Sequence, residues 1–174
     1  MDKGLVQAYY GMGRGKTSLA LGRAIHSAST GNSVIIIQFL QEKDINQINF
    51  VKRLEPEIKL FRFEKSEASF KELSDEAKLE ELQNIRNGLN FAKKVLTTKE
   101  CNVLILDGLL GLFDHQMIRP EELDILIESK SEDTEIIFTG SHIKKQMFGF
   151  LDEIVRLETI KSREHKMELS KIFY

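Results

Sequence analysis

The 174-residue sequence has few of the features that mark secreted, membrane-spanning or nucleic-acid-binding proteins. It contains one cysteine, so it forms no internal disulfide, as is typical of proteins in a reducing compartment. Its longest apolar run, at 34–37, has four residues and is far too short to span a bilayer. The net charge of −2 gives no overall basic field that would favour nucleic acid. The first apolar stretch starts near Met1, so we expect no signal peptide and a cytoplasmic location.

Nor does the sequence contain a recognisable set of catalytic side chains. Cys101 precedes an apolar stretch, where a small core residue is a simpler interpretation than a catalytic thiol. The four histidines, His26, His115, His142 and His165, do not have metal-ligand spacing. Among them, His142 follows a predicted strand end and has the best claim to contact a ligand. We therefore expect no protein side chain to act as nucleophile or general base.

The composition is that of a folded globular protein. Hydrophobic residues make up 41% and charged residues 30% of the chain, which excludes a disordered protein. A chain of this length suits one domain with a sizeable core, and we expect residues 1–174 to form it.

A glycine-rich segment between a predicted strand at 5–9 and a predicted helix at 19–28 indicates a phosphate-binding loop. Alternating glycines let backbone N–H groups point inward toward an anion, and the following helix N-terminus favours negative charge. Lys16 adds a positive charge for phosphate oxygens, and the hydroxyl of Thr17 or Ser18 suits Mg²⁺. The predicted nucleotide-binding residues are Gly11, Met12, Gly13, Arg14, Gly15, Lys16, Thr17 and Ser18.

The segment departs from the pattern G-x-x-x-x-G-K-[ST] at one position, because Tyr10 stands where the first glycine belongs. A dinucleotide-binding loop is excluded, since Lys16 occupies the position of its third glycine. The remaining alternative is a glycine-rich turn with a chance Gly-Lys-Thr. The strand before the loop and the helix after it favour the phosphate loop.

Strands and helices alternate along the rest of the chain. We predict further strands at 33–39, 58–63, 102–107, 134–140 and 151–157. We predict helices at 48–54, at 74–96 with Ser74 as N-cap, and after Arg119 with Pro120 at the start. Residues 40–46 and 64–73 are expected as loops and 108–113 as a flexible glycine-containing segment. This order predicts an α/β, P-loop NTPase-like (RecA-like) fold with about six mostly parallel strands and helices on both faces.

Asp107 ends the predicted strand at 102–107 and is the candidate second element of a magnesium site, together with Thr17. A carboxylate at the carboxyl end of a buried parallel strand faces the crevice in which α/β proteins bind ligands. The alternative is that Asp107 only caps the turn that follows it.

Four segments, in this order along the chain, resemble the P-loop type of ATP:corrinoid adenosyltransferases of the cobalamin pathway. Residues 10–17 (YGMGRGKT) resemble the family's T-G-N-G-K-G-K-T, and residues 34–40 (VIIIQFL) resemble V-V-Q-F. Residues 104–107 (LILD) resemble V-L-L-D-E. Residues 136–141 (IIFTGS) and 152–155 (DEIV) resemble I-I-T-G-R followed by A-D-x-V.

The resemblance implies transfer of the 5′-deoxyadenosyl group from ATP to a reduced corrinoid, with Mg²⁺, triphosphate as leaving group and a homodimer. Gly108 and Ser141 stand where the family has a glutamate and an arginine, and Gln41 where it has a lysine. The aromatic F-T-W segment has at best Phe70 as a counterpart. Two alternatives stay open: a non-catalytic ATP-binding or corrinoid-handling relative, and a P-loop phosphotransferase acting on another small molecule.

Overall fold

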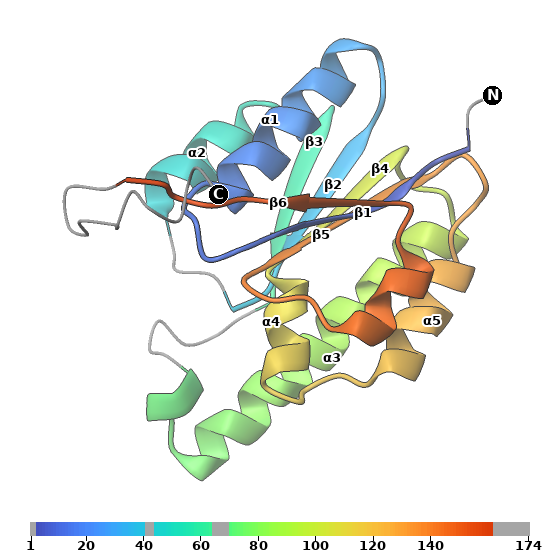
Figure 1. Ribbon diagram of the computed structural model, residues 1–174. Helices are drawn as coiled ribbons and strands as arrows, with labels where there is room; N and C mark the ends of the chain where they lie inside the picture. The colour runs from blue at the N-terminus through green and yellow to red at the C-terminus, as the bar shows by residue number, and fades with distance from the viewer. Residues whose placement is uncertain (1–2, 41–43, 64–69, 162–174) are drawn as a thin grey trace.

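The computed structural model describes residues 3–40, 44–63 and 70–161. They form a single six-stranded sheet between two layers of helices (Figure 1). All strands are parallel, in the order β3-β2-β4-β5-β1-β6. The predicted α/β, P-loop NTPase-like fold class is confirmed.

The strands follow from their side chains. Their bounds are β1 Val6–Tyr10, β2 Val34–Gln38, β3 Ile58–Arg62, β4 Val103–Asp107, β5 Glu135–Gly140 and β6 Glu153–Arg156. The central strands β2 and β4 are buried at every residue, so apolar and mainly β-branched or leucine side chains face helices on both sides. The edge strand β6 is mostly exposed; it has a charged residue at each end, Glu153 and Arg156, and two apolar residues between them.

Helices cover both faces of the sheet. One face carries α1 (Lys16–Ser29) and α2 (Ile45–Lys52); the other carries α3 (Asp75–Thr97), α4 (Leu109–Asp114) and α5 (Pro120–Glu128) (Figure 1). Two 3₁₀ segments, η1 (Phe70–Glu72) and η2 (Lys145–Phe150), complete the described elements. Each helical layer has its own buried apolar cluster against the sheet. Within the described ranges, no helix combines the length and apolar character needed to cross a bilayer.

The prediction of a flexible segment at 108–113 is wrong, because Leu109–Asp114 forms the helix α4. Gly108 is the N-cap of this helix and has a left-handed backbone with φ 88°, a conformation that glycine adopts without steric cost. Leu109, Leu112 and Phe113 are buried against the sheet, so tertiary packing stabilises a helix too short to be stable alone. The expected loop at 40–46 is also too long, because α2 begins at Ile45 with Asp44 as its N-cap.

Other predicted boundaries lie close to the observed ones. Helix α1 begins at Lys16, three residues before the predicted start, because the loop's last glycine is itself the N-cap. The predicted N-cap Ser74 accepts a hydrogen bond from the Ala77 N–H at 3.2 Å. Most of the predicted loop at 64–73 lies outside the described residues.

The parallel arrangement brings distant residues together at one edge of the sheet. The carboxyl ends of β1, β5, β4, β2 and β3 meet there, and the glycine-rich loop leaves β1 at the same edge. Strand β5 lies between β1 and β4, so it separates the loop from Asp107 by one strand.

We expect the core of β4 to dominate stability. Replacing the fully buried Leu104 by alanine should lower the free energy of unfolding by about 2–5 kcal/mol, because it removes apolar contacts and leaves a cavity. The matched control is Leu79→Ala on α3, where the side chain is 69% exposed and the change should stay within about 0.5 kcal/mol. Urea titration of both variants measures the difference. Equal stabilities would contradict the described core.

Cys101 should be chemically silent in the folded protein. It is buried, and this burial raises the pKa of its thiol to about 12. The reactive thiolate is therefore scarce at pH 8, and we expect reaction with a disulfide reagent to be roughly a thousandfold slower than in unfolded protein. Since the chain has one cysteine, the reagent's absorbance reports this residue alone. Equal rates with and without denaturant would disprove the burial.

Candidate functional site

The loop between β1 and α1 has the backbone shape that its glycines allow. Gly11 and Gly15 lie in the positive-φ region, at 131° and 103°. The Gly11 N–H donates to the Gly140 carbonyl at 3.2 Å, which anchors the start of the loop on β5. Gly15 is the N-cap of α1, so the N–H groups of Lys16, Thr17 and the next residue belong to a first helical turn without intrahelical acceptors. This arrangement suits an anion.

Lys16 folds back over the loop. Its Nζ donates to the carbonyl oxygens of Gly11 at 2.7 Å and Gly13 at 2.9 Å. Partial burial lowers the pKa of Lys16, and the nearby charge of Asp107 opposes that shift. The ammonium is thus held at the loop by neutral carbonyl acceptors, and an incoming anion would be a stronger acceptor for it.

The chain that follows β6 packs against the same loop. The Gly13 N–H donates to the Leu157 carbonyl at 3.3 Å, and the Arg14 N–H donates to the Thr159 hydroxyl at 3.2 Å. A Cβ at Gly11 would overlap the Leu157 carbonyl oxygen. This close backbone approach, besides the positive φ, explains why glycine stands at this position.

Asp107 is the centre of the polar contacts at this edge. It is 1% exposed and accepts hydrogen bonds from side chains on three other elements. Thr17 on α1 contacts both carboxylate oxygens at 3.0 Å. Thr139 on β5 donates to Oδ1 at 2.5 Å, and Gln38 on β2 donates to Oδ2 at 3.1 Å. The Gly108 N–H donates to Thr139 at 2.8 Å, so the turn after β4 is bound through Thr139.

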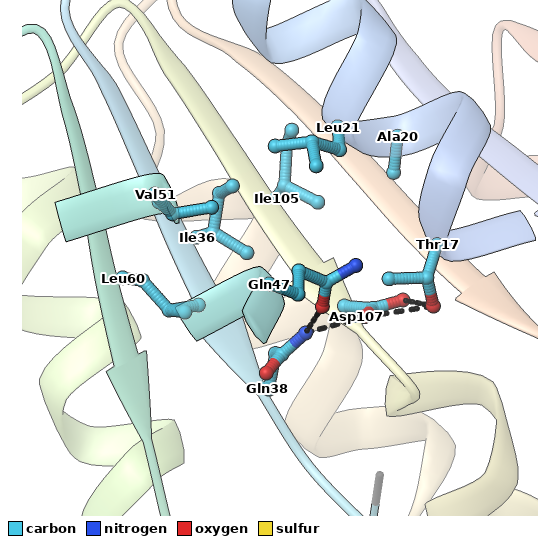
Figure 2. A pocket seen from close by; sticks show the side chains of 10 residues that line it. All are labelled: Thr17, Ala20, Leu21, Ile36, Gln38, Gln47, Val51, Leu60, Ile105 and Asp107. Atoms are coloured by element: carbon cyan, nitrogen blue, oxygen red, sulfur yellow. Dashed lines mark hydrogen bonds between the residues drawn. The ribbon is translucent and has the colours of Figure 1, made fainter. Parts of the chain in front are cut away.

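A small pocket opens beside this cluster, between α1, α2 and the sheet (Figure 2). Thr17, Asp107, Gln38 and Gln47 bring their polar atoms together, and Gln38 Nε2 lies 3.4 Å from Gln47 Oε1. The rest of the lining is apolar: Ala20, Leu21, Ile36, Val51, Leu60 and Ile105.

The oxygen atoms at this edge fit a magnesium ion. Asp107 supplies a carboxylate and Thr17 a hydroxyl, both hard oxygen ligands of the kind Mg²⁺ prefers. Among the described residues, no group of three or more histidine, cysteine or acidic side chains could hold a metal ion. Magnesium sites with one or two protein carboxylates take their remaining ligands from phosphates and water, so this set suits a metal bound with a nucleotide.

The structure places the predicted residues as follows. Thr17 and Asp107, 90 positions apart, lie in hydrogen-bond contact, while Met12 and Ser18 are exposed on the loop and first helical turn. His142 is exposed, and its Nδ1 lies 3.1 Å from Asp114 Oδ2. His26 and His115 are exposed, and His165 and Gln41 lie outside the described residues. The assignment of these residues to nucleotide and metal stays a prediction.

Three residues at this edge were not predicted as part of a site: Gln38 and Thr139, which contact Asp107, and Arg62, whose Nη1 donates to Gln38 Oε1 at 2.8 Å. Each lies at or next to the last residue of its parallel strand. That position was the available signal, because polar side chains at strand carboxyl ends face the ligand crevice. The strand order that places Gln38 and Thr139 beside Asp107, and Arg62 beside Gln38, was not available from local patterns.

Two comparisons with known proteins bear on the site. A family model described as ATP:corrinoid adenosyltransferase BtuR/CobO/CobP matches residues 2–170, nearly the whole chain. No curated protein matches the sequence.

The loop backbone should tolerate no side chain at Gly11. We expect Gly11→Ala to lower the free energy of unfolding by roughly 1–3 kcal/mol, since alanine is strained at φ 131° and its Cβ would overlap Leu157. Gly22→Ala is the matched control, because Gly22 lies exposed within α1 with open space around it and should gain up to about 1 kcal/mol. Thermal unfolding of both variants checks this, and unchanged stability of Gly11→Ala would contradict the described loop.

Proposed function

The chain belongs to the ATP:corrinoid adenosyltransferase family, and we propose that it transfers the 5′-deoxyadenosyl group from ATP to a reduced corrinoid. One observation carries the proposal beyond family membership. The hydroxyl of Thr17, at the start of α1, and the buried carboxylate of Asp107, at the end of β4, meet at 3.0 Å beside the glycine-rich loop. That is the arrangement a magnesium–triphosphate ligand requires.

In this proposal, residues 11–18 hold the triphosphate. The first turn of α1 presents N–H groups and the positive end of the helix dipole. Lys16 exchanges its loop carbonyl acceptors for phosphate oxygens, a stronger charge-assisted contact. Thr17 and Asp107 would hold Mg²⁺, which when bound neutralises phosphate charge.

The proposed reaction needs no protein nucleophile. The electron pair of Co(I) attacks the 5′-carbon of ATP, the Co–C bond forms, and the C5′–O bond breaks with its electron pair leaving on triphosphate. The chain's residues align the two reactants and stabilise negative charge on the departing triphosphate. Lys16 and the α1 N-terminus are suited to that second task.

A second candidate is a family member that binds ATP without transferring adenosyl groups. Gly108 caps α4 with a left-handed backbone where the family motif has glutamate, so the site has one carboxylate fewer. Ser141 stands where the motif has arginine, which removes a fixed cation from the end of β5. The two candidates share the nucleotide site and differ only in the chemistry.

The other predictions from the sequence remain part of the proposal. The single domain over residues 1–174 stays a proposal; one continuous sheet with a core on both faces supports it for the described residues. A homodimer and a cytoplasmic location are proposed from the family resemblance and the composition alone.

We expect the wild-type protein, mixed with MgATP and chemically reduced corrinoid, to consume the Co(I) absorbance as the Co–C bond forms. Lys16→Ala should weaken MgATP binding by roughly 10- to 100-fold, because it removes a charged hydrogen-bond donor to phosphate. Lys94→Ala, an exposed lysine in the last turn of α3, should behave as wild type. Calorimetry measures the binding.

The outcomes separate the candidates. Loss of absorbance that depends on Lys16 supports transfer. ATP binding that depends on Lys16, with no change in Co(I) absorbance, favours the second candidate. Equal nucleotide affinity of wild type and Lys16→Ala would overturn the site assignment.

A further inference from the structure

Arg62 lies in one row with Gln38 and Asp107 at the carboxyl edge of the sheet. It is the last residue of β3 and stands in register with Gln38 on β2, which in turn stands in register with Asp107 on β4. Three adjacent strands thus end in a cation, an amide and a carboxylate.

Hydrogen bonds connect the row in one direction. Arg62 Nη1 donates to Gln38 Oε1 at 2.8 Å, and Gln38 Nε2 donates to Asp107 Oδ2 at 3.1 Å. A guanidinium can only donate and a carboxylate can only accept. The opposite amide orientation would therefore place two donors against each other at Arg62 and two acceptors against each other at Asp107. Arg62 and Asp107 impose the same orientation on the amide between them.

The amide matters because it is one of two clamps on the carboxylate. Thr139 holds Oδ1 at 2.5 Å and Gln38 holds Oδ2 at 3.1 Å, so the two together set the plane that Asp107 presents to Thr17. Thr139 is held independently, by the Gly108 N–H. The hydrogen bond from Gln38 to Asp107 depends on the orientation of the Gln38 amide, and Arg62 fixes that orientation by donating to Gln38 Oε1.

The charges agree with this connection. Burial lowers the pKa of Arg62, while the charge of Asp107 opposes that shift. Asp107 acts on Lys16 in the same sense. The buried carboxylate therefore lies within electrostatic reach of one cation on the loop side and another on the far side.

We propose that Arg62 is a positioning residue for the magnesium–nucleotide site: through the Gln38 amide it orients the Asp107 carboxylate toward the metal beside Thr17. This inference rests on the proposed function, since it presumes that Mg²⁺ and ATP bind at Thr17 and Asp107. Arg62 itself contacts neither the metal nor the phosphates in this account. Without Arg62, the Gln38 amide would lose the donor at its Oε1 and be held from its Nε2 side only, so its hydrogen bond to Asp107 Oδ2 would be less well oriented.

The test compares ATP affinity with Mg²⁺ and with a chelator in its place, by calorimetry, in wild type and in Arg62→Met. Methionine keeps an apolar stem and removes every donor. We expect the gain in ATP affinity that Mg²⁺ produces to fall roughly tenfold, as is typical when a group that supports a metal ligand is removed. Metal-free ATP affinity should stay unchanged.

Three further variants make the result specific. Arg23→Met is the matched control, because Arg23 pairs with Glu135 between α1 and β5 and has no contact with the row. Arg62→Lys keeps one donor and should recover much of the Mg²⁺ effect. In an Asp107→Asn background, Arg62→Met should add no further loss, because the two residues act through one chain of contacts.

Each result decides the inference. If Mg²⁺ raises ATP affinity in the wild type, and by the same factor in Arg62→Met, the role of Arg62 is overturned and the proposed function stands. An equal loss of ATP affinity with and without Mg²⁺ shows a merely structural role and also overturns it. If the ATP affinity of the wild type is the same with and without Mg²⁺, the proposed metal site and this inference are both overturned. If Arg62→Met does not fold, Arg62→Lys and Arg62→Gln carry the same comparison.

Discussion

The buried carboxylate of Asp107 is the constraint on which the rest of this edge depends. A charge with 1% exposure is costly unless hydrogen bonds and opposite charges compensate for the lost water. Here Thr17, Thr139 and Gln38 supply the donors, and they come from α1, β5 and β2. Because each donor comes from a different element, the carboxylate can be satisfied only when the sheet is assembled in its observed order. The same contacts that stabilise the charge therefore tie the helix after the loop to three strands.

Polar groups of the glycine-rich loop are likewise hydrogen-bonded within the protein. Its lysine donates to the carbonyls of Gly11 and Gly13, and three of its N–H groups donate to the Gly140 carbonyl, the Leu157 carbonyl and the Thr159 hydroxyl. These acceptors are neutral, and hydrogen bonds to a charged phosphate oxygen are stronger than hydrogen bonds to neutral acceptors. The loop is therefore held in shape by contacts weaker than those its proposed ligand would make. The segment after β6, far away in sequence, takes part in holding that shape.

Much of the architecture could be predicted from the sequence because it depends on local patterns. Apolar β-branched runs such as 34–37 and the helical spacing within 74–96 each indicate their element without knowledge of neighbours. The family model matching residues 2–170 agrees with the ordered motifs. Segment 108–113 was wrong because its glycines suggested flexibility, whereas burial of Leu109 and Phe113 stabilises α4. The proximity of Thr17 and Asp107 could be foreseen, because the loop and helix that follow β1 and the last residue of β4 both lie at the carboxyl ends of parallel strands.

What the sequence by itself determined is the type of the six strands and of helices α1, α2, α3 and α5, the glycine-rich loop before α1, and the acid at the end of β4. These follow from propensity, side-chain period and the conformations that only glycine adopts easily. Only the tertiary structure decided that β5 lies between β1 and β4, that Thr139 and Gln38 clamp Asp107 from opposite sides, and that Arg62 stands behind Gln38. The physical reason is that these contacts join residues 24 to 69 positions apart through strand order and register. Strand order depends on how whole layers pack, and no local segment carries that information.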